Sequence, residues 1–369
     1  MKTILHIIDT TGPGGAETVF IDLASGLPKD KFRSVVVIRG QGWVYDELCR
    51  RGLAPIVLDA KGSFNWRYLS GLRRLIKREQ VDLVQSHLLG ANVYCSLAGL
   101  ATRIPVVATF HGAVDIGNNE RLKRLKFAAI NMGAQHVIAV SGGLRDDIIS
   151  RTSLNARKIE VVYNGIHSSA FQHPRSNSLR RKYGWSEHDF IIGSLGNIRP
   201  AKGYDILLDA AALLGKQGKS CHFVIAGQPD KKGLYQALLD QREELGLEEQ
   251  VQFLGFLDDP AEFLANLDLF LSTSISEGLP LSAIQAMAAQ LPLLATRCGG
   301  YEELVTDREN GWLVDVGSPV AIADAISLLA TKPEIRAKLA EKAKKHAVET
   351  FDISVMLNTY ERIYDQLMS

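Results

Sequence analysis

Short apolar runs alternate with longer segments of helical periodicity along most of this chain. In the first half the strand-like runs lie at 3–8, 34–38, 55–58, 81–85, 106–109, 136–140 and 159–162. Amphipathic segments such as 16–27, 67–78 and 122–132 lie between them. Alternation of this kind predicts a parallel sheet covered by helices on both faces.

A second series of the same type follows a polar gap. Its strand-like runs lie at 190–195, 222–226, 251–253, 269–272 and 292–295, and helical patterns at 321–329, 334–348 and 355–367 close the chain. Residues 168–187 are polar and hold His173-Pro174. We therefore expect two doubly wound α/β domains, 1–170 and 188–351, joined by a linker at 171–187. Such domains bind ligands at the carboxyl ends of their strands, so we expect a central cleft there.

Composition narrows the class of protein. The 369 residues are 46% hydrophobic and 22% charged with a formal net charge of +1, which argues against a nucleic-acid partner. No apolar run approaches the ~18 residues of a membrane span, and the first residues run directly into a strand and not a signal peptide. The four cysteines have no metal or redox spacing, which is typical of reduced thiols in a cytosolic protein.

One stretch of the second domain, Ser272–Pro292, is the main candidate for chemistry. A buried strand ends there, the turn Glu277-Gly278-Leu279-Pro280 follows, and a helix is predicted from Pro280 to Ala289. The amides at the start of that helix would attract a phosphate, a carboxylate or sugar hydroxyls. Gln285, two turns into the helix, would face the same ligand.

Three other loops follow strands and hold polar residues. Gly12–Glu17 has glycines for the close approach of an anion, but Glu17 at the third glycine position breaks a dinucleotide fingerprint. Lys202, in the loop 196–203, is a candidate phosphate ligand. His111 ends another strand, where a histidine is either a hydrogen-bonded structural residue or a functional one, and His87 is a second such candidate.

These motifs together resemble the retaining glycosyltransferases of family 4. The family carries two glutamates separated by seven residues, and here the first is Glu277 while Gln285 replaces the second; Gln290 replaces a usual glycine. Gly-Gly-Ala-Glu at 14–17 and Thr-Phe-His-Gly at 109–112 are similar to family elements. In the family's Gly-Arg-Leu…Lys-Gly element, Lys202 matches while Asn197 stands for the arginine, and we expect Arg199 to replace it.

The resemblance implies a fold and a set of site residues. The fold is GT-B, two Rossmann-like domains facing a cleft, with a last helix at 352–369 returning to the N-terminal domain. The implied catalytic residues are His111, Glu277 and Lys202. The implied donor site comprises Gly14, Gly15, Asn197, Arg199, Lys202, Gly227, Leu257, Glu277, Gly278, Leu279, Pro280, Leu281 and Gln285.

The activity implied is retaining transfer of a hexose from a nucleotide diphosphate sugar, UDP-linked in preference to GDP-mannose. The acceptor would be a saccharide or a lipid-linked saccharide in the biosynthesis of cell-surface polysaccharide or lipopolysaccharide. No cofactor is expected, and no metal, because the chain has no Asp-x-Asp pair and no cluster with metal-ligand spacing. The alternatives are a degenerate sugar-nucleotide-binding partner protein, a GT-B epimerase or phosphorylase, and a dehydrogenase, which the broken fingerprint disfavours.

A basic stretch of the first domain, Arg121–Phe127, interleaves cations with apolar residues. A second basic patch in the same domain comprises Arg73, Arg74, Lys77 and Arg78. The two are either a pair of solvated helix faces or a contact with an anionic membrane, for which Arg121–Phe127 is the better candidate. On the second interpretation Leu125 and Phe127 enter the headgroup layer, and the protein is peripheral on the cytoplasmic face of the membrane. His87, Lys123, Arg124 and Lys126 then mark the acceptor or membrane side.

Overall fold

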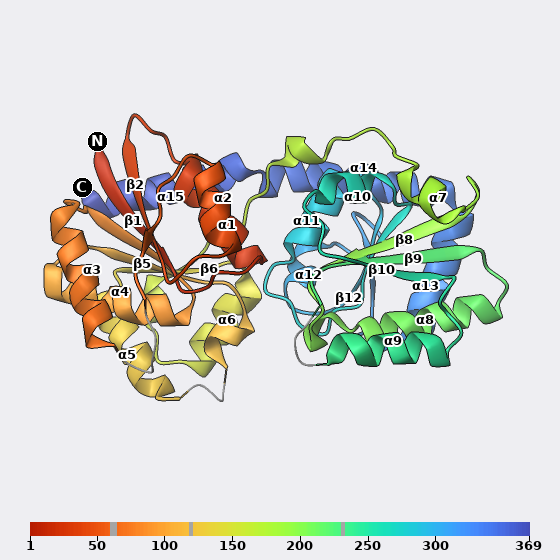
Figure 1. The fold of residues 1–369 in the computed structure, drawn as a ribbon, viewed down its shortest axis with the longest axis horizontal. Helices are drawn as coiled ribbons and strands as arrows, with labels where there is room; N and C mark the ends of the chain where they lie inside the picture. The colour runs from red at the N-terminus through yellow and green to blue at the C-terminus, as the bar shows by residue number, and fades with distance from the viewer. Residues whose placement is uncertain (60–64, 118–120, 230–232) are drawn as a thin grey trace. The chain divides into compact units, whose positions relative to one another are not determined.

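The structure is a computed structural model that describes residues 1–59, 65–117, 121–229 and 233–369. The chain divides into two compact units, of which one comprises Met1–Gly165 with Ile353–Ser369 and the other Ile166–Asp352. Each unit has its own sheet of parallel strands with helices on both faces (Figure 1). The predicted α/β class and parallel sheets are confirmed.

In the first unit the described residues form seven parallel strands in the order β3-β2-β1-β4-β5-β6-β7. The strands are β1 (Lys2–Ile8), β2 (Phe32–Ile38), β3 (Ile56–Val57), β4 (Leu83–His87), β5 (Val106–Phe110), β6 (His136–Ala139) and β7 (Ile159–Val161). The helices are α1 (Gly15–Gly26), α2 (Trp43–Arg50), α3 (Trp66–Arg78), α4 (Leu89–Thr102), α5 (Lys123–Gly133), α6 (Gly142–Arg151) and α15 (Ile353–Met368), with the 3-10 turns η1 (Ala113–Ile116) and η2 (Ala156–Lys158). Helices on both faces explain why β1, β4 and β5 are almost wholly buried.

In the second unit six described strands run in the order β10-β9-β8-β11-β12-β13. They are β8 (Phe190–Leu195), β9 (Cys221–Ala226), β10 (Val251–Gly255), β11 (Leu269–Ser272), β12 (Leu293–Thr296) and β13 (Trp312–Val314). The helices are α7 (Ser178–Tyr183), α8 (Tyr204–Lys216), α9 (Leu234–Glu244), α10 (Pro260–Ala265), α11 (Leu281–Ala288), α12 (Gly300–Leu304), α13 (Pro319–Thr331) and α14 (Pro333–Phe351), with the 3-10 turns η3 (Ser168–Phe171) and η4 (Pro200–Lys202). The core lies between the sheet and α8 and α13, around Leu208, Phe223 and Ile326.

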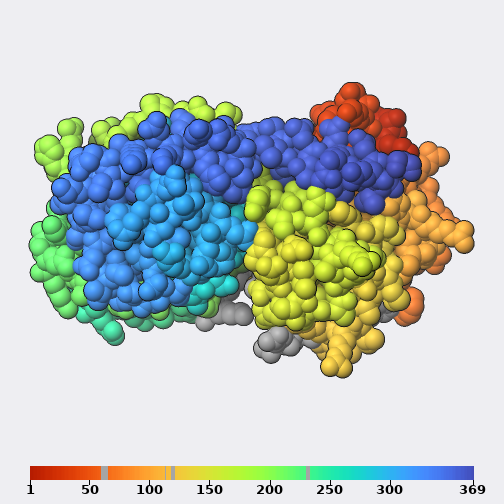
Figure 2. All heavy atoms as spheres, turned by 180° about the vertical axis from the view of Figure 1, so that it is seen from behind, coloured from red at the N-terminus to blue at the C-terminus, as the bar shows by residue number. Residues whose placement is uncertain are grey.

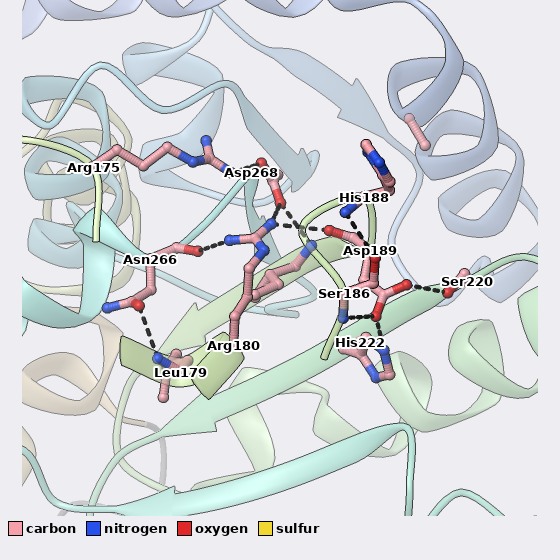
Figure 3. A network of polar contacts seen from close by, with 12 residues as sticks. Arg175, Leu179, Arg180, Ser186, His188, Asp189, Ser220, His222, Asn266 and Asp268 are labelled. Carbon is pink, nitrogen blue, oxygen red and sulfur yellow. Dashed lines mark hydrogen bonds and ion pairs between the residues drawn. The ribbon is translucent and has the colours of Figure 1, made fainter. Parts of the chain in front are cut away.

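The segment expected as a linker, 171–187, belongs to the second unit and contains α7. Arg180 of this helix is buried, and its guanidinium donates to the Asp268 carboxylate at 2.7 Å and to the Asp189 carbonyl oxygen at 2.9 Å (Figure 3). The same carboxylate accepts from the Ile191 amide. A buried arginine needs such partners. These contacts therefore fix the segment to the end of the sheet at which the central strands β8 and β11 begin.

The C-terminal helix α15 packs on the first unit, as predicted for residues 352–369. Its inner face buries Tyr360, Ile363 and Tyr364. On its outer face Glu361 pairs with Lys31 and Arg362 with Glu160. Figure 2 shows this blue C-terminal segment on the surface beside the red N-terminal residues.

Within the described part of the chain, none of the helices is long and apolar enough to cross a membrane.

Candidate functional site

The order of strands in the second sheet places two loops side by side. The sheet is wound outward in both directions from the neighbours β8 and β11, so the chain leaves these two strands toward opposite faces. The crevice at such a switch point is where open α/β sheets bind ligands. The loop after β8 carries Lys202 and the loop after β11 carries Glu277.

Lys202 and Glu277 form an ion pair. The Lys202 Nζ lies 2.5 Å from Glu277 Oε1, which also accepts from Ser274 Oγ at 2.8 Å. Both side chains are partly exposed, at 20% and 15%. The loops are also joined through the backbone, because Thr273 Oγ1 donates to the Lys202 carbonyl and the Ile275 amide to the Ala201 carbonyl. A cation and a carboxylate are therefore held together at the carboxyl end of the sheet.

Glycines pack against both residues, and at Gly299 a side chain would not fit. A Cβ on Gly299, which has φ +45°, would lie 2.2 Å from the Glu277 carbonyl oxygen, and the Gly300 amide donates to the same oxygen. A Cβ on Gly196 would lie 2.7 Å from Cε of Lys202. The turn 298–301 thus fixes the Glu277 backbone, and only glycine allows so close an approach.

The other predicted donor residues lie on loops at the same end of the sheet. Asn197 Oδ1 accepts from the Gln228 amide, so the residue that replaces the family's arginine joins the loops after β8 and β9. Gly227 has φ +159° and follows β9, and Leu257 follows β10. The Arg199 side chain is exposed, and no contact of it is found within the described ranges.

The helix after Glu277 starts one residue later than expected. α11 begins at Leu281, and Pro280 is its N-cap with φ −80° and not its first residue. The difference is small because proline's fixed φ suits either position. Gly278 and Leu279 form the turn before it, and Gln285 is half-buried on the second turn of the helix. Gly278–Leu281 and Gln285 thus follow Glu277 in the turn and in the first two turns of α11.

In the first unit the loop at Gly14 and Gly15 leads into α1, as predicted. A Cβ on Gly14 would lie 2.3 Å from Oε2 of Glu17, so the Glu17 carboxylate covers the start of the helix. A carboxylate is favourable at a helix N-terminus. The amides at the start of α1, which were expected to attract the anion of a ligand, therefore already have the Glu17 carboxylate beside them.

His111 follows β5 and contacts His87 at the end of β4. The His87 Nδ1 and His111 Nε2 atoms are 2.8 Å apart, and the rings are stacked with centroids 5.1 Å apart. Burial lowers the pKa of His111 to about 3 and that of His87 well below its usual value, so both rings are uncharged at neutral pH. Asp115 fixes the loop by accepting from the His111 amide at 2.8 Å, and burial raises its pKa to about 6.

The position of His87 corrects one expectation. Its side chain is fully buried behind His111 and against Phe20, so it has no surface with which to touch an acceptor directly. Two residues that contact these histidines were missed from the sequence: Asp115, and Gln85, whose Nε2 lies 3.2 Å from His87 Nε2. A carboxylate four residues after a strand-end histidine was the available signal for Asp115, and Gln85 had none.

The basic stretch differs from the expectation in one apolar residue. Phe127 is buried and stacks on Phe110, so it cannot enter a headgroup layer. Leu122 and Leu125 are 62% and 67% exposed instead. The Lys123 ammonium donates to the Ile116 carbonyl, whereas Arg124 is exposed. Lys126 is only partly exposed.

The described residues hold no group of three or more His, Cys, Asp or Glu side chains arranged to bind a metal ion.

Acid should destabilise the first unit. The buried rings of His6, His87 and His111 have lowered pKa values. Below pH 6.5 the unfolded chain therefore binds more protons at these histidines than the folded chain does. Stability from these groups is present above pH 6.5 and lost as pH falls. Asp115 and Asp9, whose pKa values burial raises, oppose this in part because their carboxyls take up protons in the folded state. We expect the free energy of unfolding to fall by about 2 to 3 kcal/mol between pH 6 and 5. Urea unfolding measures it: His87→Asn should make the slope shallower, and an unchanged stability from pH 7 to 5 would contradict the prediction.

Two family models match the chain and between them span most of it. The model "Glycosyltransferase Family 4" matches residues 13–170 and "Glycosyl transferases group 1" matches residues 176–346. Each covers one predicted domain. Both predicted domains are therefore matched by models of known glycosyltransferase families.

Similar proteins include enzymes and a solved structure with a nucleotide. The crystal structure of Anabaena HepE in complex with UDP and glucose has a TM-score of 0.89 and 25% identity, covering 99% of this chain and 100% of that one. N-acetyl-alpha-D-glucosaminyl L-malate synthase of Bacillus anthracis is 27% identical over 80% of this chain and 77% of its own. The capsular polysaccharide biosynthesis glycosyltransferase CapM of Staphylococcus aureus is 24% identical over 80% and 79%. With two Rossmann-like sheets, a returning C-terminal helix and both family models matched, the chain belongs to family 4 of the retaining, metal-independent glycosyltransferases and has the GT-B fold.

Proposed function

We propose that this enzyme transfers a hexose from a UDP-sugar to a saccharide or lipid-linked saccharide during the synthesis of a cell-surface polysaccharide. The observation that carries the proposal is the Lys202–Glu277 pair at the switch point of the second sheet. A nucleotide diphosphate needs a cation beside its phosphates, and a sugar needs a fixed acceptor for its hydroxyls. Lys202 would bind the diphosphate, with Arg199 and the start of α11, and Glu277 would bind sugar hydroxyls.

The proposed preference for UDP rests on the similarity of this chain to HepE. HepE, similar over nearly its whole length, was solved with UDP and glucose. CapM is named for capsular polysaccharide biosynthesis, which supports a saccharide acceptor here. The base would meet main-chain atoms near Leu257, after β10, because the loops after β9 and β10 lie at the same end of the sheet as Lys202. No protein nucleophile is assigned for retention, and His111 is proposed to contact the transferred sugar.

A panel of nucleotides tests the donor. A ligand that binds only the native state raises its melting temperature, so UDP and UDP-hexoses should stabilise the protein while GDP, GDP-mannose and ADP do not. Stabilisation by GDP-mannose alone would refute the UDP assignment. Turnover of a UDP-hexose without acceptor, or only with phosphate, would identify an epimerase or a phosphorylase instead.

Gln285 is expected to bind the ribose hydroxyls. An amide can donate to one hydroxyl and accept from another, although without the strength of a carboxylate. Gln285→Glu should therefore change UDP affinity by only a few fold, and Gln285→Leu should weaken it at least about fivefold, the value of one hydrogen bond. Calorimetry measures both, and unchanged affinity in Gln285→Leu would remove the ribose role.

The proposed acceptor side includes a peripheral membrane contact on the cytoplasmic face. Arg121, Arg124, Leu122 and Leu125 are all exposed, which combines cations with apolar side chains that could enter a headgroup layer. The double variant Arg121→Glu/Arg124→Glu should bind anionic vesicles at least about thirtyfold more weakly, since each surface cation contributes roughly 1 kcal/mol. Lys123 and Lys126 are left unchanged in this variant, because Lys123 donates to the Ile116 carbonyl and Lys126 is only partly exposed.

The control makes the same charge change on α3, where Arg73 and Arg74 are exposed. Arg73→Glu/Arg74→Glu should bind like the parent in sedimentation with anionic vesicles, and neither variant should bind neutral ones. Equal sedimentation of the parent and the Arg121→Glu/Arg124→Glu variant would show that this stretch is a solvated helix face.

A further inference from the structure

A chain of buried hydrogen bonds connects the C-terminal helix to His111. The Tyr364 hydroxyl, on α15, donates to Gln85 Oε1 at 3.0 Å. Gln85 Nε2 lies 3.2 Å from His87 Nε2, and His87 Nδ1 lies 2.8 Å from His111 Nε2. Tyr364, Gln85 and His87 are all fully buried, and all four residues belong to the first unit.

In an uncharged histidine, the hydrogen bond at one ring nitrogen determines whether the other nitrogen donates or accepts. A neutral imidazole has one N–H donor and one acceptor nitrogen, and a nitrogen that accepts a hydrogen bond leaves the proton on the other one. Both His87 and His111 are uncharged because burial lowers their pKa values. The direction of the bond at His87 Nε2 therefore fixes the proton positions of both rings.

The orientation of the Gln85 amide sets that direction, and its surroundings determine the orientation. The NH2 group has two protons and three neighbours: Thr109 Oγ1 at 2.9 Å, His87 Nε2 at 3.2 Å and the Ser86 carbonyl oxygen, which can only accept, at 3.3 Å. One proton goes to Thr109 and the other to His87 Nε2, which is nearer than the carbonyl oxygen. The oxygen side faces the Tyr364 hydroxyl, whose proton has no other acceptor within the described ranges. Turning the amide over would place its oxygen against the Ser86 carbonyl and leave the buried phenol without an acceptor, which is unfavourable.

We propose that Tyr364 and Gln85 are positioning residues that hold His87 and His111 in the Nδ1–H tautomer, so that His111 presents an N–H donor and not an acceptor. Gln85 donates to His87 Nε2, His87 Nδ1–H donates to His111 Nε2, and the one proton of His111 is left on Nδ1. The C-terminal helix thus determines the hydrogen-bonding character of a residue at the end of β5.

The donor that results is left without a partner. His111 Nδ1 is buried without a hydrogen-bond partner in the part of the chain that the structure describes. A buried N–H of this kind is stabilised when an oxygen binds it. The functional consequence rests on the proposed function: a sugar hydroxyl or a developing negative charge on the leaving phosphate oxygen would accept from Nδ1–H, whereas the other tautomer would leave two acceptors facing each other.

Nitrogen NMR of the free enzyme, labelled at histidine, tests the tautomers without any substrate. Protonated and unprotonated ring nitrogens have well-separated ¹⁵N shifts, so the proton can be placed directly. We expect Nδ1–H at both His87 and His111 in the parent and a second tautomer at both in Tyr364→Phe, which removes only the hydroxyl. An Nε2–H tautomer at His111 in the parent, or unchanged tautomers in Tyr364→Phe, would overturn the proposal.

Tyr360→Phe is the matched control. Tyr360 lies one turn earlier on α15 and is equally buried. Its hydroxyl lies 3.3 Å from Thr109 Oγ1 and reaches Gln85 only through that oxygen, which can accept the Gln85 N–H with or without it. Both variants should melt at similar temperatures, but only Tyr364→Phe should change the tautomers and lower kcat, by about tenfold with KM little changed, the equivalent of one hydrogen bond. Changed tautomers with an unchanged kcat would overturn the role of His111 as donor. Tautomers as expected in a protein that binds no UDP-sugar would refute the proposed function and leave the positioning intact.

Discussion

Replacing Lys202 by alanine is expected to lower kcat/KM for sugar transfer by at least about a thousandfold, the upper range for removing one group that stabilises charge in a transition state. Transfer adds a negative charge to the β-phosphate of the departing diphosphate, and in our proposal the Lys202 ammonium is the principal cation beside it. The side chain is partly exposed and its main contact is the Glu277 carboxylate, so the fold should survive its removal. Steady-state kinetics with a UDP-hexose and a saccharide acceptor measure the loss.

Lys216→Ala provides the control, because Lys216 is an exposed lysine at the end of α8 in the same unit. Both variants should keep the parent's circular dichroism. A Lys202→Ala enzyme within tenfold of the parent would refute the phosphate role.

Glu277→Gln should tighten the binding of UDP and at the same time lower kcat for sugar transfer. In the ligand-free protein the carboxylate holds the Lys202 ammonium at 2.5 Å, so a diphosphate must compete with it. The neutral amide removes the competing charge and should tighten UDP binding by about threefold to tenfold, a fraction of a charge-assisted hydrogen bond. It also weakens the acceptor for the sugar hydroxyls, and kcat should fall at least about a hundredfold.

Calorimetric titration with UDP and kinetics with the complete donor measure the two effects. Glu302→Gln, at an exposed position in the first turn of α12, changes the same charge nearby and should alter neither quantity. Weaker UDP binding by Glu277→Gln would mean that the carboxylate does not compete for Lys202, and unchanged kcat would exclude its contact with the sugar.

The local pattern of apolar and polar residues was sufficient to predict most strands of the two sheets. Strands such as β1 and β9 are buried on both faces, so their apolar runs are continuous and end sharply at loops. The three-residue strand β13 was missed because Trp312–Val314 is too short for a periodic signal. The polar composition at 171–187 suggested a linker, but polarity alone could not show that Arg180 is buried against Asp268.

The site was predictable as a set of motifs and not as a set of contacts. Lys202 and Glu277 are brought together by the order β8-β11, which alternation along the chain does not determine. Phe127 occupies a helical position compatible with either the surface or the core, and only its packing on Phe110 decides. Gln290 has φ +60°, a left-handed conformation that explains the family's glycine but is unfavourable for a glutamine.

The buried polar chain behind His111 left the weakest trace in the sequence. Gln85 lies within β4 and Tyr364 within an amphipathic helix nearly at the end of the chain. Each is ordinary for its element, since a polar residue in a strand and a tyrosine on a helix face need no special explanation. Only the packing of α15 on the first sheet brings them within a hydrogen bond.

The most direct measurement of the central claim compares UDP with uridine. Both carry the base and ribose, so the difference in their affinities reports the diphosphate alone. Titration of the parent should show UDP binding at least about a hundredfold more tightly, as expected for charge-assisted hydrogen bonds, and Lys202→Ala should reduce this difference to a few fold. Equal affinities for UDP and uridine in the parent, or a hundredfold difference that persists in Lys202→Ala, would contradict the placement of the donor diphosphate at Lys202.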